Sequence, residues 1–310
     1  MRERIPKGSN LANSLMEILC MGKEAIYRRL RGEVAFTFEE VSLISQHLGI
    51  SLDKIVGRRM LNDTMFDLNL LHTGDPIESY YEILVRYAKL FDLLRDDPTA
   101  SVATASNLIP FTFYSPYECL SKFRLGRWIY HHGKMKPPAS LSDLQVPDKV
   151  PQMHWKLSAS IRQLSHTSFI WDYNIFRSIV KEIRYFAGLD LLSAEDVRNM
   201  KKELGLLLSE LEAVTTTGEF SKGHSLAIYL SDINFEATYT YVEKGDFQAC
   251  LFRVYSINSM DSQNPRMCNI QKNWIQSLKR HSTLISQSSE IQRRQFFNEQ
   301  REIVESLQEA

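Results

Sequence analysis

Three arginines stand almost side by side near the start of the chain, in the stretch GKEAIYRRLRGE (residues 22–33). Arg28, Arg29 and Arg31 come at the end of a short helical pattern, directly before Gly32, which is a natural stop signal for a helix. Guanidinium groups can donate hydrogen bonds to phosphate oxygens and to guanine O6 and N7, so the run suits contact with a nucleic acid. The other interpretation is a solvated helix face, because charge runs usually face water.

The residues around this run predict a series of short helices. Leu11, Leu15, Ile18 and Leu19 recur at helical spacing and predict a first helix over residues 11–19, after the turn and cap residues 8–10. A second helix is expected over residues 23–31, with Ala25, Ile26 and Leu30 as its apolar positions. The turn between the two helices is about three residues long, so we expect them to cross steeply.

A third helix is predicted to follow, because Thr37 with Glu40 three residues later forms a capping box. Its core-facing residues are expected to be Phe38, Val41, Ile44 and Leu48. Gly49 closes this helix, and a last short helix is expected after Ser51.

This order of helices resembles the Cro/CI-type (XRE-like) helix-turn-helix family of transcriptional regulators. The match covers roughly residues 9–57, under a fifth of the chain. The sequence departs from the family at Cys20, where the family usually has a left-handed Gly, and at Met16, where a small residue is usual. The family's first helix would fall in residues 1–5. The residues that carry the resemblance are Leu15, Ile26, Arg31, Gly32, Thr37, Leu48, Gly49, Ile50, Ser51 and Leu52.

The resemblance implies that the helix from Lys23 to Arg31 is a recognition helix that lies in the major groove of DNA. By position, the base contacts would come from Lys23, Glu24, Tyr27 and Arg28. Lys and Arg side chains can donate to guanine, and Glu24 can accept from cytosine N4. Arg31 would contact phosphate, and Arg29 is expected to do the same from the flank.

The remaining residues predict a second and larger domain. We expect residues 1–57 to form the helix-turn-helix domain, residues 58–63 a hinge, and residues 64–310 a domain of unknown family that dimerises or senses an effector. The helices expected in this domain begin at Pro76 and near residues 116, 154, 173, 193, 265 and 288, and residues 65–70 and 107–114 read as strand-like. The helices over residues 193–214 and 288–307 carry apolar stripes. We favour these two helices as the dimer interface, and the alternative is that both stripes are buried within their own domain.

Three β-rich runs, residues 225–233, 237–243 and 246–256, follow one another and predict an antiparallel meander, with a tight hairpin at residues 243–246. The predicted fold class is therefore a small all-α helix-turn-helix domain followed by a larger, mostly helical α+β domain with an antiparallel β-meander.

Composition and motifs favour a binding protein over an enzyme. Lys+Arg and Asp+Glu both total 37, which excludes a uniformly basic nucleic-acid coat but allows a local basic patch. We find no P-loop, G-x-G-x-x-G, G-x-S-x-G or H-E-x-x-H motif, and we expect no metal or cofactor. His131 and His132 are adjacent, which is the wrong spacing on a helix to chelate one ion. Six aromatic residues would line a ligand pocket or pack in the core: Phe111, Phe113, Tyr114, Tyr117, Trp128 and Tyr130.

The cysteines form no C-x-x-C pair, no stretch approaches the ~18–20 apolar residues of a membrane span, and no signal peptide is evident, so we expect a cytoplasmic protein. The sequence thus predicts a bacterial-type, sequence-specific transcriptional regulator. Its expected partners are double-stranded DNA, a second copy of the chain and an unidentified small-molecule or protein effector. The alternative is a protein-interaction module or an enzyme docked through a helix-turn-helix scaffold that does not read DNA.

Overall fold

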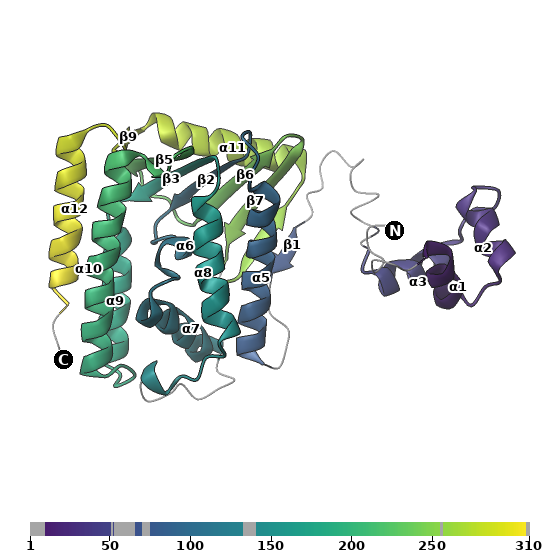
Figure 1. Cartoon of the computed structure of the whole chain (residues 1–310), viewed down its shortest axis with the longest axis horizontal. Coiled ribbons are helices and arrows are strands. Elements are labelled where there is room, and N and C mark those ends of the chain that lie inside the picture. The colour runs from purple at the N-terminus through teal and green to yellow at the C-terminus, as the bar shows by residue number, and fades with distance from the viewer. Residues whose placement is uncertain are drawn as a thin grey trace. The chain divides into compact units, whose positions relative to one another are not determined.

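The chain divides into two compact units, residues 1–65 and residues 66–310. The computed structural model in Figure 1 describes residues 10–50, 52, 66–69, 75–132, 141–254 and 257–307. The predicted hinge at residues 58–63 and the family's first helix at residues 1–5 lie outside these residues, as does the last short helix apart from Leu52.

The described part of the first unit contains three helices, which are α1 (Leu11–Leu19), α2 (Lys23–Leu30) and α3 (Phe38–Leu48). Their bounds confirm the predicted helix positions. The Thr37–Glu40 capping box that begins α3 is present in full, with both reciprocal hydrogen bonds. A small core holds the helices together, and its buried members are Ala12, Leu15, Ile26 and Ile44.

Cys20 ends α1 in the left-handed conformation, with φ 51° and ψ 40°. The Cys20 backbone N–H donates to the carbonyl of Met16, as does the N–H of Met21 at 3.2 Å. The left-handed conformation is costly for a residue with a Cβ atom, so the tight turn into α2 is held by these hydrogen bonds and by the packing of the two helices.

Phe38 does not face the core as predicted. Its side chain is 83% exposed, whereas Ile44 is buried and Leu48 is partly buried against the core. Phe38 is the first residue of α3, and its side chain lies outside the small core that α1, α2 and α3 share.

The described residues of the second unit form one nine-stranded sheet in the order β1-β8-β7-β6-β2-β3-β5-β4, with β9 paired to β5. The β2–β3 and β3–β5 pairs are parallel, and the other pairs are antiparallel. The strands are β1 (Asp67–Asn69), β2 (Ser101–Ser106), β3 (His166–Asp172), β4 (Glu219–Ser221), β5 (His224–Ser231), β6 (Tyr239–Lys244), β7 (Phe247–Arg253), β8 (Ser259–Ser262) and β9 (Ser282–Leu284).

Helices cover both faces of this sheet (Figure 1). A single helix, α11, packs on one face against β6 and β7, and the other helices gather on the opposite face. The helices are α5 (Pro76–Leu94), α6 (Phe111–Tyr114), α7 (Glu118–His132), α8 (Lys149–Arg162), α9 (Ile175–Ala187), α10 (Ala194–Thr217), α11 (Pro265–Arg280) and α12 (Glu290–Glu305), with a 3-10 turn at Leu141–Asp143.

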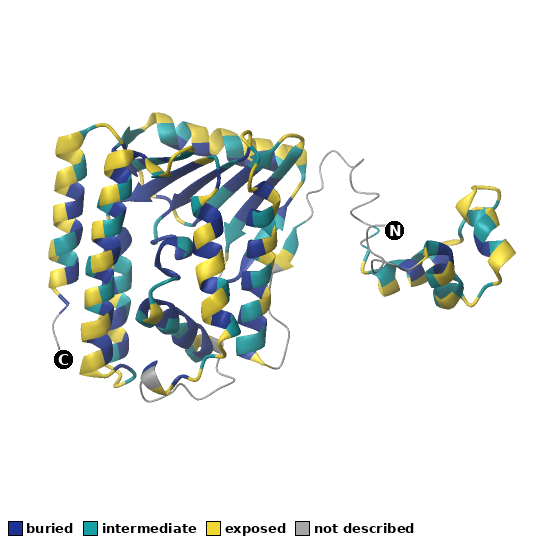
Figure 2. Cartoon of the chain, in the orientation of Figure 1, coloured by how far each residue is buried: buried dark blue, intermediate teal, exposed yellow. Residues whose placement is uncertain are grey.

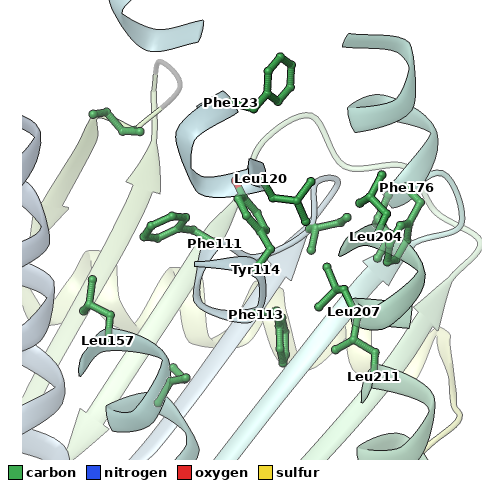
Figure 3. Packing of buried hydrophobic residues seen from close by; sticks show 14 of the residues in the cluster. Phe111, Phe113, Tyr114, Leu120, Phe123, Leu157, Phe176, Leu204, Leu207 and Leu211 are labelled. Atoms are coloured by element: carbon green, nitrogen blue, oxygen red, sulfur yellow. The ribbon is translucent and has the colours of Figure 1, made fainter. Parts of the chain in front are cut away.

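The main core of the second unit lies between the sheet and the larger helical layer. Figure 2 shows the helices of this layer buried toward the sheet and exposed on the outside. Residues from α6, α7, α8, α9 and α10 converge there, among them Phe113, Leu120, Leu157, Phe176 and Leu207 (Figure 3). Strands β2 and β3 are buried along almost their whole length, as is usual for parallel strands covered on both faces.

The predicted fold class is wrong. The sheet is mixed and nine-stranded, and the three β-rich runs do not form an antiparallel meander. The β6–β7 hairpin is present as expected, but β5 is separated from β6 by β2 and β3 and runs parallel to β3. The predicted all-α helix-turn-helix start is not matched either: between residues 10 and 50 the structure describes the three helices α1, α2 and α3.

The apolar stripes of α10 and α12 are used inside the second unit. Leu204, Leu207, Leu208 and Leu211 of α10 are buried, as are Phe296 and Val304 of α12, and the two helices contact each other. These stripe residues therefore pack within their own unit, which is the alternative to the dimer interface favoured from the sequence. Residues 107–114, expected to be strand-like, instead form a loop and the short helix α6.

Among the described residues, no helix combines the length and apolarity needed to cross a membrane.

Candidate nucleic-acid interface

Helix α2 points one residue, Ile26, into the core of the first unit and turns most of its polar side chains toward solvent. Ile26 is fully buried, and it anchors the helix against the core residues of α1 and α3. Lys23, Glu24 and Arg28 are exposed, as is Arg31, which ends the helix. Tyr27 is half-buried, and the Lys23 Nζ atom lies 5.9 Å from the centre of its ring. The structure therefore places the predicted base-contacting residues on one short, anchored helix.

Arg29 differs from the other arginines of this helix because its guanidinium is bound to α3. Its Nε and Nη2 atoms donate to the two carboxylate oxygens of Glu40, at 2.9 and 2.7 Å. The side chains of this pair are only 15% and 10% exposed. Glu40 Oε2 also accepts from the backbone N–H of Thr37 at 3.0 Å, so the pair links α2 to the capping box of α3. Of the predicted phosphate contacts, Arg29 has the least freedom to reach DNA.

Arg28 and Arg31 are also paired with carboxylates, but at the exposed surface. Arg31 Nε donates to Glu33 at 2.7 Å and its Nη2 lies 3.4 Å from Glu24, while Arg28 Nε lies 3.5 Å from Glu33. The hydrogen bond from Arg31 lowers the pKa of Glu33, which is therefore ionised at neutral pH. Exposed pairs of this kind contribute little free energy, so a phosphate group can replace Glu33 as the partner at small cost.

The N-terminus of α2 has no side-chain cap. Its N-cap residue is Gly22, which offers no side-chain acceptor to the first-turn N–H groups. These N–H groups and the positive end of the helix dipole favour an anion such as a backbone phosphate. The arginines of this region can be found from the sequence, but their carboxylate partners cannot, although Glu40 belongs to the predicted capping box.

In the second unit, the six aromatic residues give a mixed result. Phe111, Phe113, Tyr114 and Trp128 are buried in the main core, and Tyr117 and Tyr130 pack against it. Phe111 also lines a cavity of about 90 Å³, so it is at once a core residue and a pocket residue. His131 is exposed, and no group of three or more His, Cys, Asp or Glu residues that can hold a metal ion occurs in the described part of the chain.

Comparison with known proteins finds no family model, no curated protein and no solved structure that matches this chain.

Proposed function

We propose that the chain is a sequence-specific DNA-binding transcriptional regulator that acts in the cytoplasm as a homodimer and reads the major groove with α2. The observation that carries this proposal is the arrangement of α2. Buried Ile26 fixes the helix to its unit, while Lys23, Glu24 and Arg28 face solvent. The tight turn at Cys20 and the resemblance to Cro/CI-type regulators point in the same direction.

The side chains of α2 divide into three roles, which are base contact, phosphate contact and positioning of the helix. Lys23 and Arg28 can donate to guanine O6 and N7, Glu24 can accept from cytosine N4, and the Tyr27 ring can contact an adjacent base. Arg31 supplies a phosphate contact once its exposed pair with Glu33 opens. Arg29 acts mainly on the position of α2, through Glu40. Two such units on one two-fold axis would bind half-sites ~34 Å apart.

A second candidate function is a protein-interaction module, and the exposed apolar residues of α2 and α3 favour it. Phe38 is 83% exposed, Leu43 39% and Leu30 37%. Exposed apolar side chains beside ion-paired arginines are typical of a surface that binds another protein. Under this alternative, the first unit would recruit another protein and would not bind duplex DNA.

Selection of bound sites from a random duplex library, followed by gel shifts at two salt concentrations, tests the proposed function. We expect the full chain to enrich a defined site and to bind it more weakly at the higher salt concentration, because phosphate contacts release counterions. If no sequence is enriched from the library and no gel shift appears at low salt, the proposal is contradicted and the protein-interaction module is favoured.

Variants of the arginines need to be chosen with their partners in mind. Arg29→Ala leaves Glu40 without its partner at a position where Glu40 is only 8% exposed, so it is expected to weaken the first unit itself. Arg31→Ala removes only exposed pairs, and the fold should be retained. A loss of DNA binding is therefore diagnostic for Arg31 and ambiguous for Arg29.

A further inference from the structure

The cavity in the second unit lies between the sheet and the helices α5, α6 and α8, with strands β2, β6 and β7 along one side. Its volume is about 90 Å³. At one end stands Arg253, the last residue of β7, whose backbone N–H donates to Thr238 at 3.2 Å. Thr238 in turn bonds Ser106, the last residue of β2, at 3.1 Å. This end of the cavity is therefore where the parallel strand β2 finishes, which is where ligands commonly bind in sheets with parallel strands.

Two arginines, Arg124 and Arg253, line this cavity. Arg124 comes from α7 and is only 6% exposed. Its Nη1 atom donates to the Tyr114 hydroxyl at 2.9 Å, and its guanidinium carbon lies 4.2 Å from the centre of the Phe111 ring. Its Nε atom has no hydrogen-bond partner among the residues that the structure describes. Arg253, the last residue of β7, is partly buried.

Neither of these two arginines is within ion-pair distance of a carboxylate in the described part of the chain. The groups that act electrostatically on them are tyrosines and other arginines. Burial, and then the charge of Arg124, lower the pKa of Arg253 to about 10. Both guanidinium groups therefore remain charged at neutral pH, and the two like charges face one cavity.

Two partly buried arginines of the same unit do have carboxylate partners. Arg127, also on α7, is paired with Glu182, and Arg162 on α8 is paired with Glu210 at 2.5 Å. A buried charge without a partner of opposite sign is costly, so proteins normally provide one. At the cavity, the described residues provide none, and an anionic ligand would complete the site.

The rest of the lining sets the size and character of that ligand. It is mainly apolar, with a few hydroxyl groups such as those of Thr104 and Thr240, which lie 3.0 Å apart. On the α5 side, Tyr87 donates to Ser259 at 3.1 Å. The volume is smaller than the roughly 150 Å³ of a cavity that accepts benzene. The site therefore suits a small anion, or the anionic head of a ligand whose body extends through the open end.

We propose that this cavity binds a small oxyanion, a carboxylate or a phosphate, held between Arg124 and Arg253. Planar guanidinium groups match the two oxygens of such anions, and charge-assisted hydrogen bonds of this type are the stronger ones. The hydroxyl groups supply further donors, and the apolar walls accept a short hydrocarbon chain. The proposal goes beyond DNA binding and stands independently of it, because the anion is held entirely within the second unit.

Calorimetric titration and thermal unfolding of the full chain, without DNA, test this proposal. The probes are inorganic phosphate and butyrate, with butyramide as the neutral isostere of butyrate and potassium chloride at matched ionic strength. We expect phosphate or butyrate to bind saturably and to raise the unfolding temperature, and which of them binds identifies the head group. Butyramide and chloride should not reproduce the effect.

Arg253→Met is the informative variant, and Arg162→Met is its matched control at an arginine that has a carboxylate partner. We expect Arg253→Met to weaken binding of the effective probe roughly tenfold or more. Without anion, this variant should be at least as stable as the wild type, because one of two like charges is gone. Arg162→Met should bind the probe as the wild type does. Arg253→Gln provides a polar second variant in case the methionine misfolds.

Three results would overturn the proposal. The first is that neither phosphate nor butyrate binds the wild-type chain. The second is an equal response to butyramide or chloride, which would remove the assignment to an oxyanion. The third is unchanged binding in a folded Arg253→Met or Arg253→Gln variant. A failure to bind DNA would leave all three results unaffected, since no step of this experiment uses DNA.

Discussion

Helix α2 of the first unit and the cavity of the second unit use arginine in opposite ways. In the first unit, Arg28 and Arg31 are exposed and each lies beside a carboxylate, and Arg29 is held by Glu40. In the second unit, Arg124 is buried and Arg253 is partly buried, and neither has a carboxylate partner among the described residues. Arg28 and Arg31 are thus paired where water is available, whereas among the described residues the two cavity arginines lack a carboxylate where water is largely excluded.

This difference separates two kinds of anion recognition. An exposed, paired arginine can exchange one anion for another at little cost, which suits a reversible contact with a DNA backbone. A buried arginine without a partner of opposite charge is energetically costly, and the binding of one specific, small anion relieves this cost. The net charge of zero says nothing about either, because what matters is the burial and the partner of each group.

The largest expected effect is the loss of stability when a buried side chain is truncated. Two adjacent leucines of α10 allow the comparison with an exposed side chain. Leu207 is fully buried in the second unit, whereas Leu206 is 53% exposed. Leu207→Ala should lower the free energy of unfolding of this unit by about 2–5 kcal/mol, because it leaves a cavity. Leu206→Ala should change it by less than about 0.5 kcal/mol. Chemical denaturation of the second unit's transition measures both.

The oligomeric state of the same two variants gives a further check. If the α10 stripe belongs to the core, Leu207→Ala should alter stability and leave the molar mass in light scattering unchanged. If Leu207→Ala instead abolishes a dimer and leaves the free energy of unfolding unchanged, the stripe forms a subunit interface. That result would contradict its assignment to the core.

The next effect is the loss of folding stability at acid pH, which should occur at different pH values in the two units. His154 in the second unit accepts or donates a hydrogen bond with Tyr80 at 2.9 Å. Burial, and then Arg124, lower the pKa of His154 from 6.5 to about 4. Between these pH values the unfolded chain binds a proton that the folded chain does not. Stability is therefore complete above pH 6.5 and falls by about 3 kcal/mol as the pH drops to about 4.

The first unit should respond at lower pH. The hydrogen bond from Arg29 lowers the pKa of Glu40 below 4.5, so this pair stabilises the unit above pH 4.5 and is lost as the pH falls through the lowered value. Unfolding followed from pH 7 to pH 3 should show the second unit weakening first. His154→Gln should flatten that slope, and His131→Gln serves as the control for removing an exposed imidazole. If the pH dependence of the unfolding free energy persists in His154→Gln, another titratable group causes it.

A smaller effect is expected at the proposed base contacts. Arg28→Ala should weaken binding to the selected site roughly five- to hundredfold and relax preference at one base pair, because one guanidinium contact to a base edge is lost. Arg28 is exposed, and its pair with Glu33 is loose at 3.5 Å, so the fold should not change. Binding measured on all four base pairs at each position would identify the contact. An equal loss at every sequence would instead make Arg28 a phosphate contact.

The sequence predicted local structure better than it predicted pairing. Caps such as Asp75–Pro76 and Ser193–Asp196 located α5 and α10 because they satisfy backbone groups within a few residues. The partner of a strand depends on distant residues. The β2 strand, SVATAS, has small side chains and no strong β pattern, yet it lies between β6 and β3. Missing it made β5, β6 and β7 look like neighbours.

The candidate sites show the same limit. The arginines of α2 are adjacent in sequence and could be found there, but their partner Glu40 lies eleven residues from Arg29 and across a turn. Arg124 and Arg253 are far apart in the chain, and only the fold brings them to one cavity. The available signal was that apolar residues flank each arginine, Phe123 and Leu125 for Arg124 and the run ACLFRVY for Arg253. A charged residue among apolar neighbours is informative, because such residues are seldom buried.

The salt dependence of duplex binding by the full chain tests the central claim, that α2 binds DNA, most directly. The wild type, Arg31→Ala and Lys222→Ala are compared on the selected site, with Lys222 as an exposed cation of the second unit. We predict that Arg31→Ala weakens binding to all sequences and reduces the slope of log affinity against log salt by about one, the value for one lost phosphate contact. Lys222→Ala should match the wild type. Wild-type affinity that does not change with salt, or an identical slope in Arg31→Ala, would contradict the account.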